Sequence, residues 1–154
     1  VLDEYPNLVI TQTLSKAYGL AGIRLGICYA STEVISVLNK IKPPYNVNEL
    51  SQKRALERLA DTDKISTEIA SIIRQREDLL EVLLHVEFVK KIYPTEANFI
   101  LVKVDDANKR YAELIAKGIV IRNRTMQPLC DNCLRLTVGT ELENRKLMAV
   151  LKQL

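Results

Sequence analysis

The chain has 154 residues, the length of one ordinary domain with room for a sizeable hydrophobic core. Hydrophobic residues make up 47% of it and charged residues 27%, a balance typical of a soluble globular protein that excludes an intrinsically disordered chain. The 22 basic and 19 acidic residues are scattered and leave a net charge of +3, which argues against nucleic-acid binding. Because no hydrophobic run could span a membrane and no signal peptide opens the sequence, we expect a cytoplasmic protein.

The first sixty residues predict a pair of strands followed by two helices. Two apolar, β-rich runs flank the sequence Ser-Lys-Ala-Tyr-Gly, and turn-forming residues bound them. Ser31 or Thr32 caps the first helix, the pair Pro43-Pro44 ends it, and Asn48 caps the second helix. The predicted elements are strands at 8–13 and 23–30 and helices at 32–41 and 48–60.

The remaining chain predicts one long helix and then a compact α/β arrangement. Isoleucine and leucine recur at helical spacing over 64–84, and the charged residues lie mostly on the opposite face. Short β-rich runs then alternate with helical segments, one of which is closed by Gly118. The predicted elements are strands at 89–93, 98–104, 119–122 and 134–138 and helices at 108–117 and 141–154. They predict a small α+β domain packed on the long helix.

Segment 13–26, TLSKAYGLAGIRLG, carries the most informative pattern in the chain. It places the Ser15 hydroxyl beside Lys16, and Arg24 follows eight residues later, after several small residues. A lysine that binds an aldehyde covalently needs a fixed, dry position where its neutral amine is available. Hydroxyl and guanidinium groups hold phosphate, and glycine lets a ligand approach the backbone closely. The pattern therefore predicts a lysine that carries a phosphorylated aldehyde cofactor, for which pyridoxal 5'-phosphate is the obvious choice.

The same segment closely resembles the cofactor-lysine motif of the fold-type I pyridoxal-phosphate aminotransferases. The resemblance continues to the end of the chain, where IRNR at 121–124 and CLRLTVGTELEN at 133–144 resemble the C-terminal domain of the histidinol-phosphate aminotransferase family. The segments at 43–48 and 97–101 also match that family's pattern. The lysine motif is specific for the superfamily, and the C-terminal segments narrow the resemblance to this family.

The resemblance implies an α/β fold that combines the end of the large cofactor-binding domain with a small C-terminal α+β domain. We expect residues 1–47 to be a remnant of the large domain, 48–85 to be connecting helices and 86–154 to be the small domain. The chain would then be the C-terminal portion of a longer enzyme that acts as a homodimer, and we expect it to lack full activity alone.

The resemblance also implies roles for the residues of the lysine motif. Lys16 would hold pyridoxal 5'-phosphate and then move a proton during the reaction, while Ser15 and Arg24 would bind the cofactor's phosphate, with Thr13 as a weaker third donor. The alternatives are a surface lysine at a strand end and an arginine paired with a surface carboxylate.

Two arginines near the end of the chain are implied to bind the substrate's phosphate. Arg135 alternates with Leu134 and Leu136 on a strand, so it faces away from the leucines. Arg122 lies at another strand end, and two arginines that converge on one anion suit a dianion. The implied substrates are histidinol phosphate and the 2-oxoglutarate/glutamate pair, in histidine biosynthesis. A structural salt bridge is the alternative for each arginine.

Other readings of the sequence remain open. The enzyme could be another class I/II aminotransferase or a relative of phosphothreonine decarboxylase, and the chain by itself could be a non-catalytic fragment. Cys130 and Cys133 form a CxxC pair, but a zinc site needs further ligands and only Cys28 and His85 are available. We therefore expect free thiols and no metal.

Overall fold

The computed structural model describes all 154 residues and divides into two compact units, Val1–Thr67 (unit 1) and Glu68–Leu154 (unit 2). The length alone predicted one ordinary domain. That expectation was wrong, because the buried hydrophobic residues form two separate clusters. Helix α3 (Thr62–Leu83) contributes its first residues to unit 1 and the rest to unit 2. None of the helices combines the length and the hydrophobicity needed to cross a membrane.

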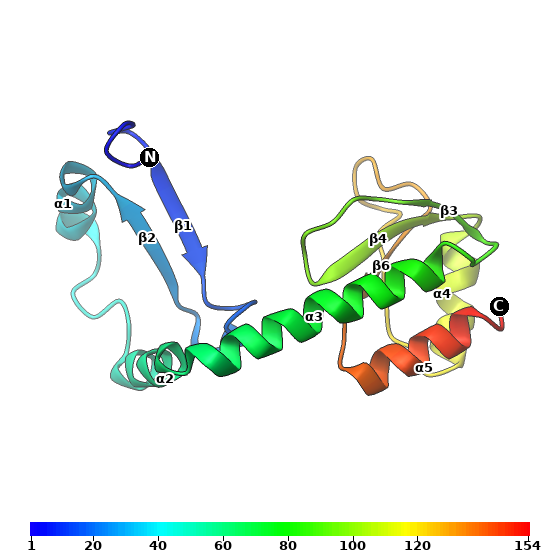
Figure 1. Ribbon diagram of the computed structural model, residues 1–154. Helices are drawn as coiled ribbons and strands as arrows, with labels where there is room; N and C mark the ends of the chain where they lie inside the picture. Colours follow the sequence, from blue (N-terminus) through cyan, green and yellow to red (C-terminus); the bar gives the residue numbers. More distant parts are fainter. The chain divides into compact units, whose positions relative to one another are not determined.

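Unit 1 is built on an antiparallel hairpin of β1 (Val9–Thr13) and β2 (Gly26–Ala30), shown in blue in Figure 1. The first strand lies within the predicted range. The second begins three residues later than predicted, because Ala21–Ile23 forms a 3-10 turn (η1) and Arg24 adopts a left-handed backbone that a strand cannot contain. All five residues of β1 are exposed, so this hairpin has little core of its own.

Two capped helices complete unit 1, α1 (Thr32–Ile41) and α2 (Glu49–Ala60). The Ser31 hydroxyl accepts a hydrogen bond from the Val34 amide, and the Asn48 side chain accepts one from the Ser51 amide at 2.9 Å. Both predicted caps are therefore confirmed. Helix α1 buries none of its residues, whereas α2 buries Ser51 and Ala55.

Unit 2 contains a four-stranded antiparallel sheet in the order β3-β4-β6-β5. Its strands are β3 (Val89–Ile92), β4 (Phe99–Val104), β5 (Arg122–Asn123) and β6 (Cys133–Thr137). The predicted strand at 119–122 was largely wrong. Only its last residue, with Asn123, pairs with β6, because Ile119 and Ile121 pack into the core outside the ladder.

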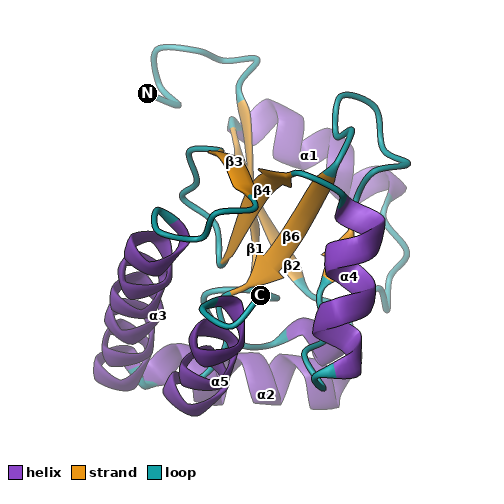
Figure 2. Ribbon diagram, turned by 90° about the vertical axis from the view of Figure 1, so that its right-hand side faces the viewer, coloured by secondary structure: helices purple, strands orange, loops and turns teal.

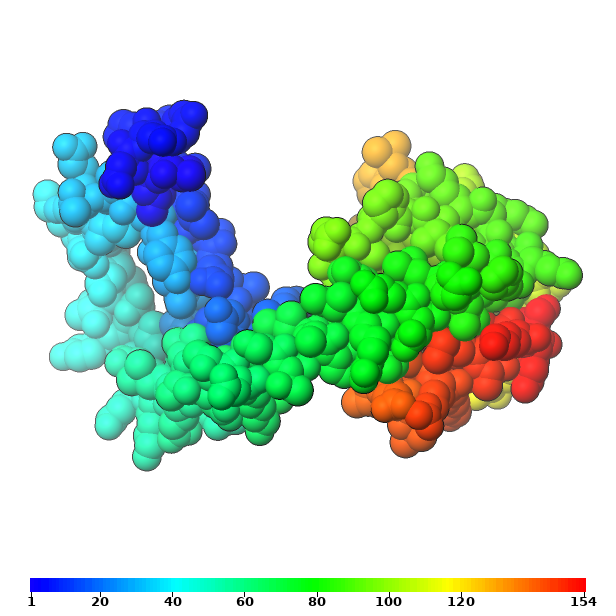
Figure 3. All heavy atoms as spheres, viewed as in Figure 1, coloured from blue at the N-terminus to red at the C-terminus, as the bar shows by residue number.

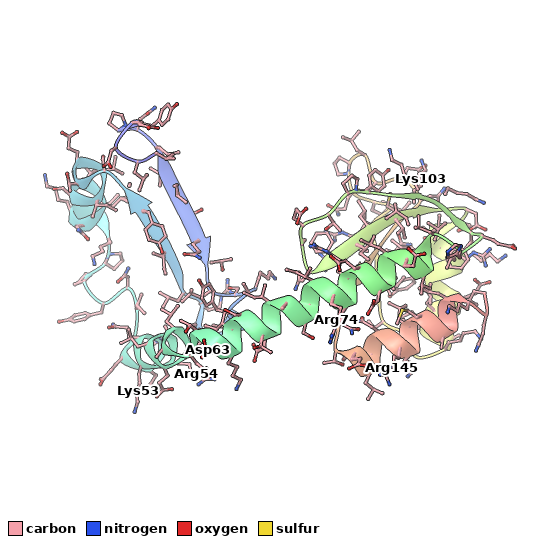
Figure 4. The ribbon with its side chains drawn as sticks, in the orientation of Figure 1. Lys53, Arg54, Asp63, Arg74, Lys103 and Arg145 are labelled. Carbon is pink, nitrogen blue, oxygen red and sulfur yellow. The ribbon has the colours of Figure 1, made fainter.

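Three helices, α3, α4 (Ala107–Ala116) and α5 (Glu141–Leu151), pack on the same face of this sheet (Figure 2). Side chains of β4 alternate between buried and half-buried, and the buried ones join the helices in one core. The largest fully buried hydrophobic members of this core are Leu79, Leu83, Ile100, Leu114, Leu134 and Leu136. On the opposite, outer face, β4 carries the half-buried Phe99 and Leu101 together with the charged Lys103 (Figure 4).

One buried amide links α3, α5 and the end of β6. Asn144 is 1% exposed, and its side chain accepts a hydrogen bond from the Gly139 amide at 2.9 Å. The same side chain donates to the Gln75 side chain at 3.0 Å and to the Gly139 carbonyl at 3.1 Å. Both of its N–H donors and its oxygen thus have protein partners, so its loss leaves buried polar groups without partners.

We predict that Asn144→Ala lowers the free energy of unfolding by about 1–3 kcal/mol, because Gln75 and Gly139 keep buried groups that water cannot reach. Urea unfolding followed by circular dichroism measures this change. Leu142→Ala, on the exposed side of the same helix, is the matched control and should change stability far less. Equal losses in the two variants would show that the amide network does not stabilise unit 2.

Candidate functional site

The predicted cofactor lysine lies in a tight turn between β1 and η1. The Gly19 amide donates to the Lys16 carbonyl at 2.8 Å, and the Leu20 amide donates to the Leu14 carbonyl at 3.0 Å. Gly19 has a φ of +68°, a conformation that glycine adopts without the penalty that other residues pay. The backbone therefore closes on itself, and Lys16 lies exposed in the turn, without a carboxylate or hydrogen-bond partner for its amine.

Buried leucines on either side hold this turn against helix α2. Leu14 is 1% exposed and Leu20 6%, and both pack with Ala55 of α2. The Arg58 side chain, one turn further along α2, donates to the Tyr18 carbonyl at 2.9 Å. The position of the Lys16 backbone is thus set by a helix that begins more than thirty residues later in the chain.

The structure brings two of the three predicted phosphate-binding residues together. The Thr13 hydroxyl accepts a hydrogen bond from the Ser15 amide at 3.1 Å, which fixes both hydroxyl-bearing residues next to Lys16. Arg24 is exposed, has a φ of +54°, and its guanidinium donates to the Ala21 carbonyl at 3.0 Å instead of contacting Ser15 or Lys16. A left-handed backbone is costly for a residue with a Cβ, by about 1–2 kcal/mol, so the surrounding turn must hold it.

The two predicted substrate arginines lie side by side in unit 2. Arg122 of β5 is directly opposite Arg135 of β6 in the antiparallel ladder. Residues in that position have Cβ atoms about 5 Å apart on the same face of the sheet. Neither guanidinium has a carboxylate partner. Two like charges are therefore held together on the outer face without an anion of this chain between them.

Arg135 has a further unsatisfied group. Its guanidinium carbon lies 5.0 Å from the centre of the Phe99 ring, and its Nε is buried without a hydrogen-bond partner. A buried donor without an acceptor costs about 1–3 kcal/mol, and a cation over an aromatic face offsets part of that cost. The half-buried Arg135 is thus oriented by Phe99 and retains the capacity to donate to an anion.

Neither Arg122 nor Arg135 forms a salt bridge in the structure, whereas Arg110 forms two. Arg110 binds Asp105 at 2.7 Å and Glu113 at 2.9 Å and lies over the Phe88 ring. The Arg110 guanidinium holds the pKa of the Asp105 carboxyl far below its usual range. The lowered pKa of Asp105 therefore results from an ion pair that ties α4 to the loop before it, and does not mark a functional site.

Sequence reasoning missed the residues that hold the predicted site in place. The Arg58 and Ser51 side chains donate to the backbone carbonyls of Tyr18 and Ile23, which lie far away in the sequence. The Phe99 ring contacts Arg135, also distant in the sequence. No local sequence pattern predicts such contacts. The chain has no group of three or more His, Cys, Asp or Glu that could hold a metal ion, and its three cysteines are free. Two larger surface hollows, of about 520 and 440 Å³, are lined by neither Lys16 nor Arg135.

The chain thus combines a mixed α/β fold with an exposed lysine turn and a sheet that carries two opposed arginines. The chain belongs to the aminotransferase class I and II family, whose family model matches residues 1–151. It is 78% identical over 153 residues to a histidinol-phosphate aminotransferase of Flavobacterium johnsoniae, covering 99% of this chain and 44% of that relative. The family expected from the sequence is confirmed, and the chain spans less than half the length of the curated relatives it matches.

Solved structures share the fold. The histidinol-phosphate aminotransferase from Clostridium acetobutylicum superimposes with a TM-score of 0.89 at 27% identity, over 99% of this chain and 47% of that one. The histidinol-phosphate aminotransferase from Sinorhizobium meliloti, solved in complex with pyridoxal-5'-phosphate, has a TM-score of 0.77 at 24% identity, over 96% of this chain and 42% of that one. This chain thus has the mixed α/β fold of part of a class I and II aminotransferase.

The opposition of Arg122 and Arg135 predicts that the stability of the chain depends on ionic strength. In Arg122→Gln the repulsion with Arg135 is removed, so we expect stability at low ionic strength to rise by about 0.2–1 kcal/mol and the gain to shrink as salt screens the charges. Urea unfolding at low and high salt measures both values. Arg74→Gln, which removes an exposed arginine of α3 (Figure 4), is the control. The same salt dependence in the two variants would contradict repulsion between Arg122 and Arg135.

Proposed function

We propose that the chain is the C-terminal part of a pyridoxal-phosphate aminotransferase that exchanges amino groups between histidinol phosphate and 2-oxoglutarate. The observation that carries this proposal is the turn at Lys16, which presents an amine without a carboxylate partner beside two hydroxyl groups. The 78% identity to a histidinol-phosphate aminotransferase supports the choice of substrate. The complete reaction, its homodimer and its place in cytoplasmic histidine biosynthesis are proposed for the full-length protein, and this chain alone is proposed to lack full activity.

We assign the hairpin β1–β2 and the Lys16 turn to the large cofactor-binding domain, within residues 1–47. Residues 48–85 are proposed to be connecting helices, and 86–154 to be the small C-terminal α+β domain. The exposed hydrophobic side chains of the hairpin, Val9, Ile10 and Tyr29, support this assignment, because a strand pair of this kind normally pairs or packs within a larger sheet.

The residues of the turn fit pyridoxal 5'-phosphate. Lys16 supplies an amine, Ser15 and Thr13 supply hydroxyl groups, and Arg24 supplies a cation, which is the donor set that an aldehyde and a phosphate need. A Cβ added at Gly19 or Gly22 would meet no other atom within 4 Å, so the chain leaves open space beside the turn. Arg24 would have to exchange its bond to the Ala21 carbonyl for the phosphate.

In this proposal the protein's own residues position groups and move one proton. When bound, the cofactor supplies a conjugated ring that accepts the electron pair of the reacting carbon. The Lys16 amine would hold the cofactor and, when free, would carry a proton to and from the substrate carbon that bears the amino group. Leu14 and Leu20 keep the Lys16 backbone fixed during both roles.

The opposed arginines are proposed to bind the substrate's phosphate. Arg135 and Arg122 place two guanidinium groups on one face of the sheet, and a phosphate dianion would replace their repulsion with charge-assisted hydrogen bonds. The buried Nε of Arg135 would gain an acceptor in the same step. Another class I/II aminotransferase or a phosphothreonine decarboxylase relative would differ chiefly in the anion that meets these arginines, so a substrate-dependent spectral change separates them.

The test is to add pyridoxal phosphate to the purified chain, reduce with borohydride, and locate adducts by mass spectrometry. We expect a saturable adduct on Lys16 that is absent in Lys16→Ala. Arg24→Ala should raise the apparent Kd about tenfold or more, because a hydrogen bond to a charged group contributes about 1.5–3 kcal/mol. Lys42→Ala, which removes an exposed lysine of the same unit, is the control. Labelling spread evenly over surface lysines would contradict a preformed cofactor site and favour the non-catalytic fragment.

A further inference from the structure

The loop between β5 and β6 is a chain of three consecutive β-turns. In each of them the amide of the fourth residue donates to the carbonyl of the first: Gln127 to Arg124 at 2.8 Å, Cys130 to Gln127 at 3.1 Å, and Cys133 to Cys130 at 3.0 Å. The Arg124 amide donates to the Cys133 carbonyl at 2.8 Å and closes the base of the loop. The loop projects from the rest of unit 2, as Figures 1 and 3 show.

The backbone of this loop is held in a strained form. Leu129 and Asn132, each the third residue of its turn, have φ values of +62° and +53°. Asparagine tolerates this conformation, but for leucine it is energetically unfavourable. The Leu129 side chain is 99% exposed, so burial does not offset this cost. The turns at 127–130 and 130–133 are therefore fixed by their hydrogen bonds and by Pro128, not by packing of Leu129.

The last turn brings the two cysteines of the CxxC pair together. The first and fourth residues of a β-turn have Cα atoms less than about 7 Å apart, and disulfides span Cα distances of about 4.4–6.8 Å. The Cys133 thiol contacts the Asp131 carbonyl at 3.5 Å, so its sulfur points back into the turn that begins at Cys130. The hydrogen-bonded turn thus brings the two Cα atoms close to the separation that a Cys130–Cys133 bridge spans.

The surroundings give the two thiols different reactivity. Cys130 is half-buried, whereas Cys133 is fully buried. Burial raises the pKa of the Cys133 thiol, and hydrogen bonding with the Tyr93 hydroxyl and the nearby Lys103 ammonium oppose that rise. Burial also raises the pKa of Tyr93, and interaction with both Cys133 and Cys130 raises it further, so both sulfurs lie near one phenol. A reagent in solution therefore reaches Cys130 first.

We infer that Cys130 and Cys133 are a reversible redox site that closes to an intramolecular disulfide with small disulfides such as oxidised glutathione. The Cys130 thiolate attacks one sulfur of the reagent, whose S–S bond breaks and releases one thiol. The Cys133 thiolate then attacks the Cys130 sulfur and releases the second thiol. The protein loses two electrons and two protons, and the reagent gains them as two thiols.

The bridge would lie at the start of the strand that carries Arg135. Cys133 is the first residue of β6, and Arg135 follows it on the same outer face. In the reduced chain, the start of β6 is tied to the loop by the Cys133 amide and by the thiol contact with Asp131. A covalent closure of the last turn replaces that thiol contact and leaves the backbone hydrogen bonds in place.

The experiment incubates the purified chain with oxidised glutathione, alkylates the remaining thiols, and maps the peptides by mass spectrometry. The expected product is a Cys130–Cys133 disulfide with little glutathione retained on either cysteine. The exposed Cys28 is an internal control and should keep its glutathione, because it lies in strand β2 and neither of the other cysteines is in that hairpin. In Cys133→Ser, glutathione should accumulate many-fold on Cys130, since the resolving thiol is absent.

Cys130→Ser is the second variant, because Cys133 is buried and its replacement could disturb folding. There Cys133 should stay unmodified, since the accessible thiol is missing; circular dichroism checks the fold of both variants. Glutathione that persists on Cys130 of the unaltered chain, or two cysteines that both remain free to be alkylated, would overturn the inference. The unaltered chain decides this by itself if Cys133→Ser fails to fold.

Discussion

The burial of Leu14 and Leu20 against helix α2 is the contact on which the candidate active site depends. It closes the turn between the hydrogen-bonded residues Leu14 and Leu20, and Lys16 lies exposed between these two buried leucines. Arg58 reinforces the contact from α2 by binding the Tyr18 carbonyl. The hydrophobic effect thus fixes the backbone position of Lys16, and the chemistry proposed for this residue belongs to a side chain that takes no part in the packing.

Elements with local signals could be predicted from the sequence, and those that depend on distant partners could not. The caps at Ser31 and Asn48 are short-range hydrogen bonds that the sequence states directly, and both were confirmed. The predicted strand at 119–122 failed because β5 exists only where Arg122 and Asn123 meet β6, which periodicity cannot reveal. The late start of β2 has a different cause, the 3-10 turn at Ala21–Ile23 and the left-handed backbone of Arg24 that follows it.

The candidate site shows the same division. Residue type and spacing pointed to Lys16, Ser15 and Arg24, but no sequence pattern could show that Arg58 of α2 binds the Tyr18 carbonyl and supports their turn. Arg122 lies opposite Arg135 because of the register in which β5 pairs with β6. The position of Phe99 beneath Arg135 likewise follows from the pairing of β4 with β6. The family resemblance indicated the roles expected for Arg122 and Arg135. The sheet pairing explains why these two arginines lie next to each other without a carboxylate partner.

Amide hydrogen exchange by NMR tests most directly whether packing on α2 fixes the Lys16 turn. The Leu20 amide should exchange about tenfold or more slowly than that of Ala17, because its exchange requires breaking the bond to Leu14 and exposing both leucines. Ala55→Glu, which drives a charge into that contact, should abolish the protection, while Leu56→Glu on the exposed side of α2 should preserve it. Fast exchange at Leu20 in the unaltered chain, or equal effects of the two substitutions, would contradict the account.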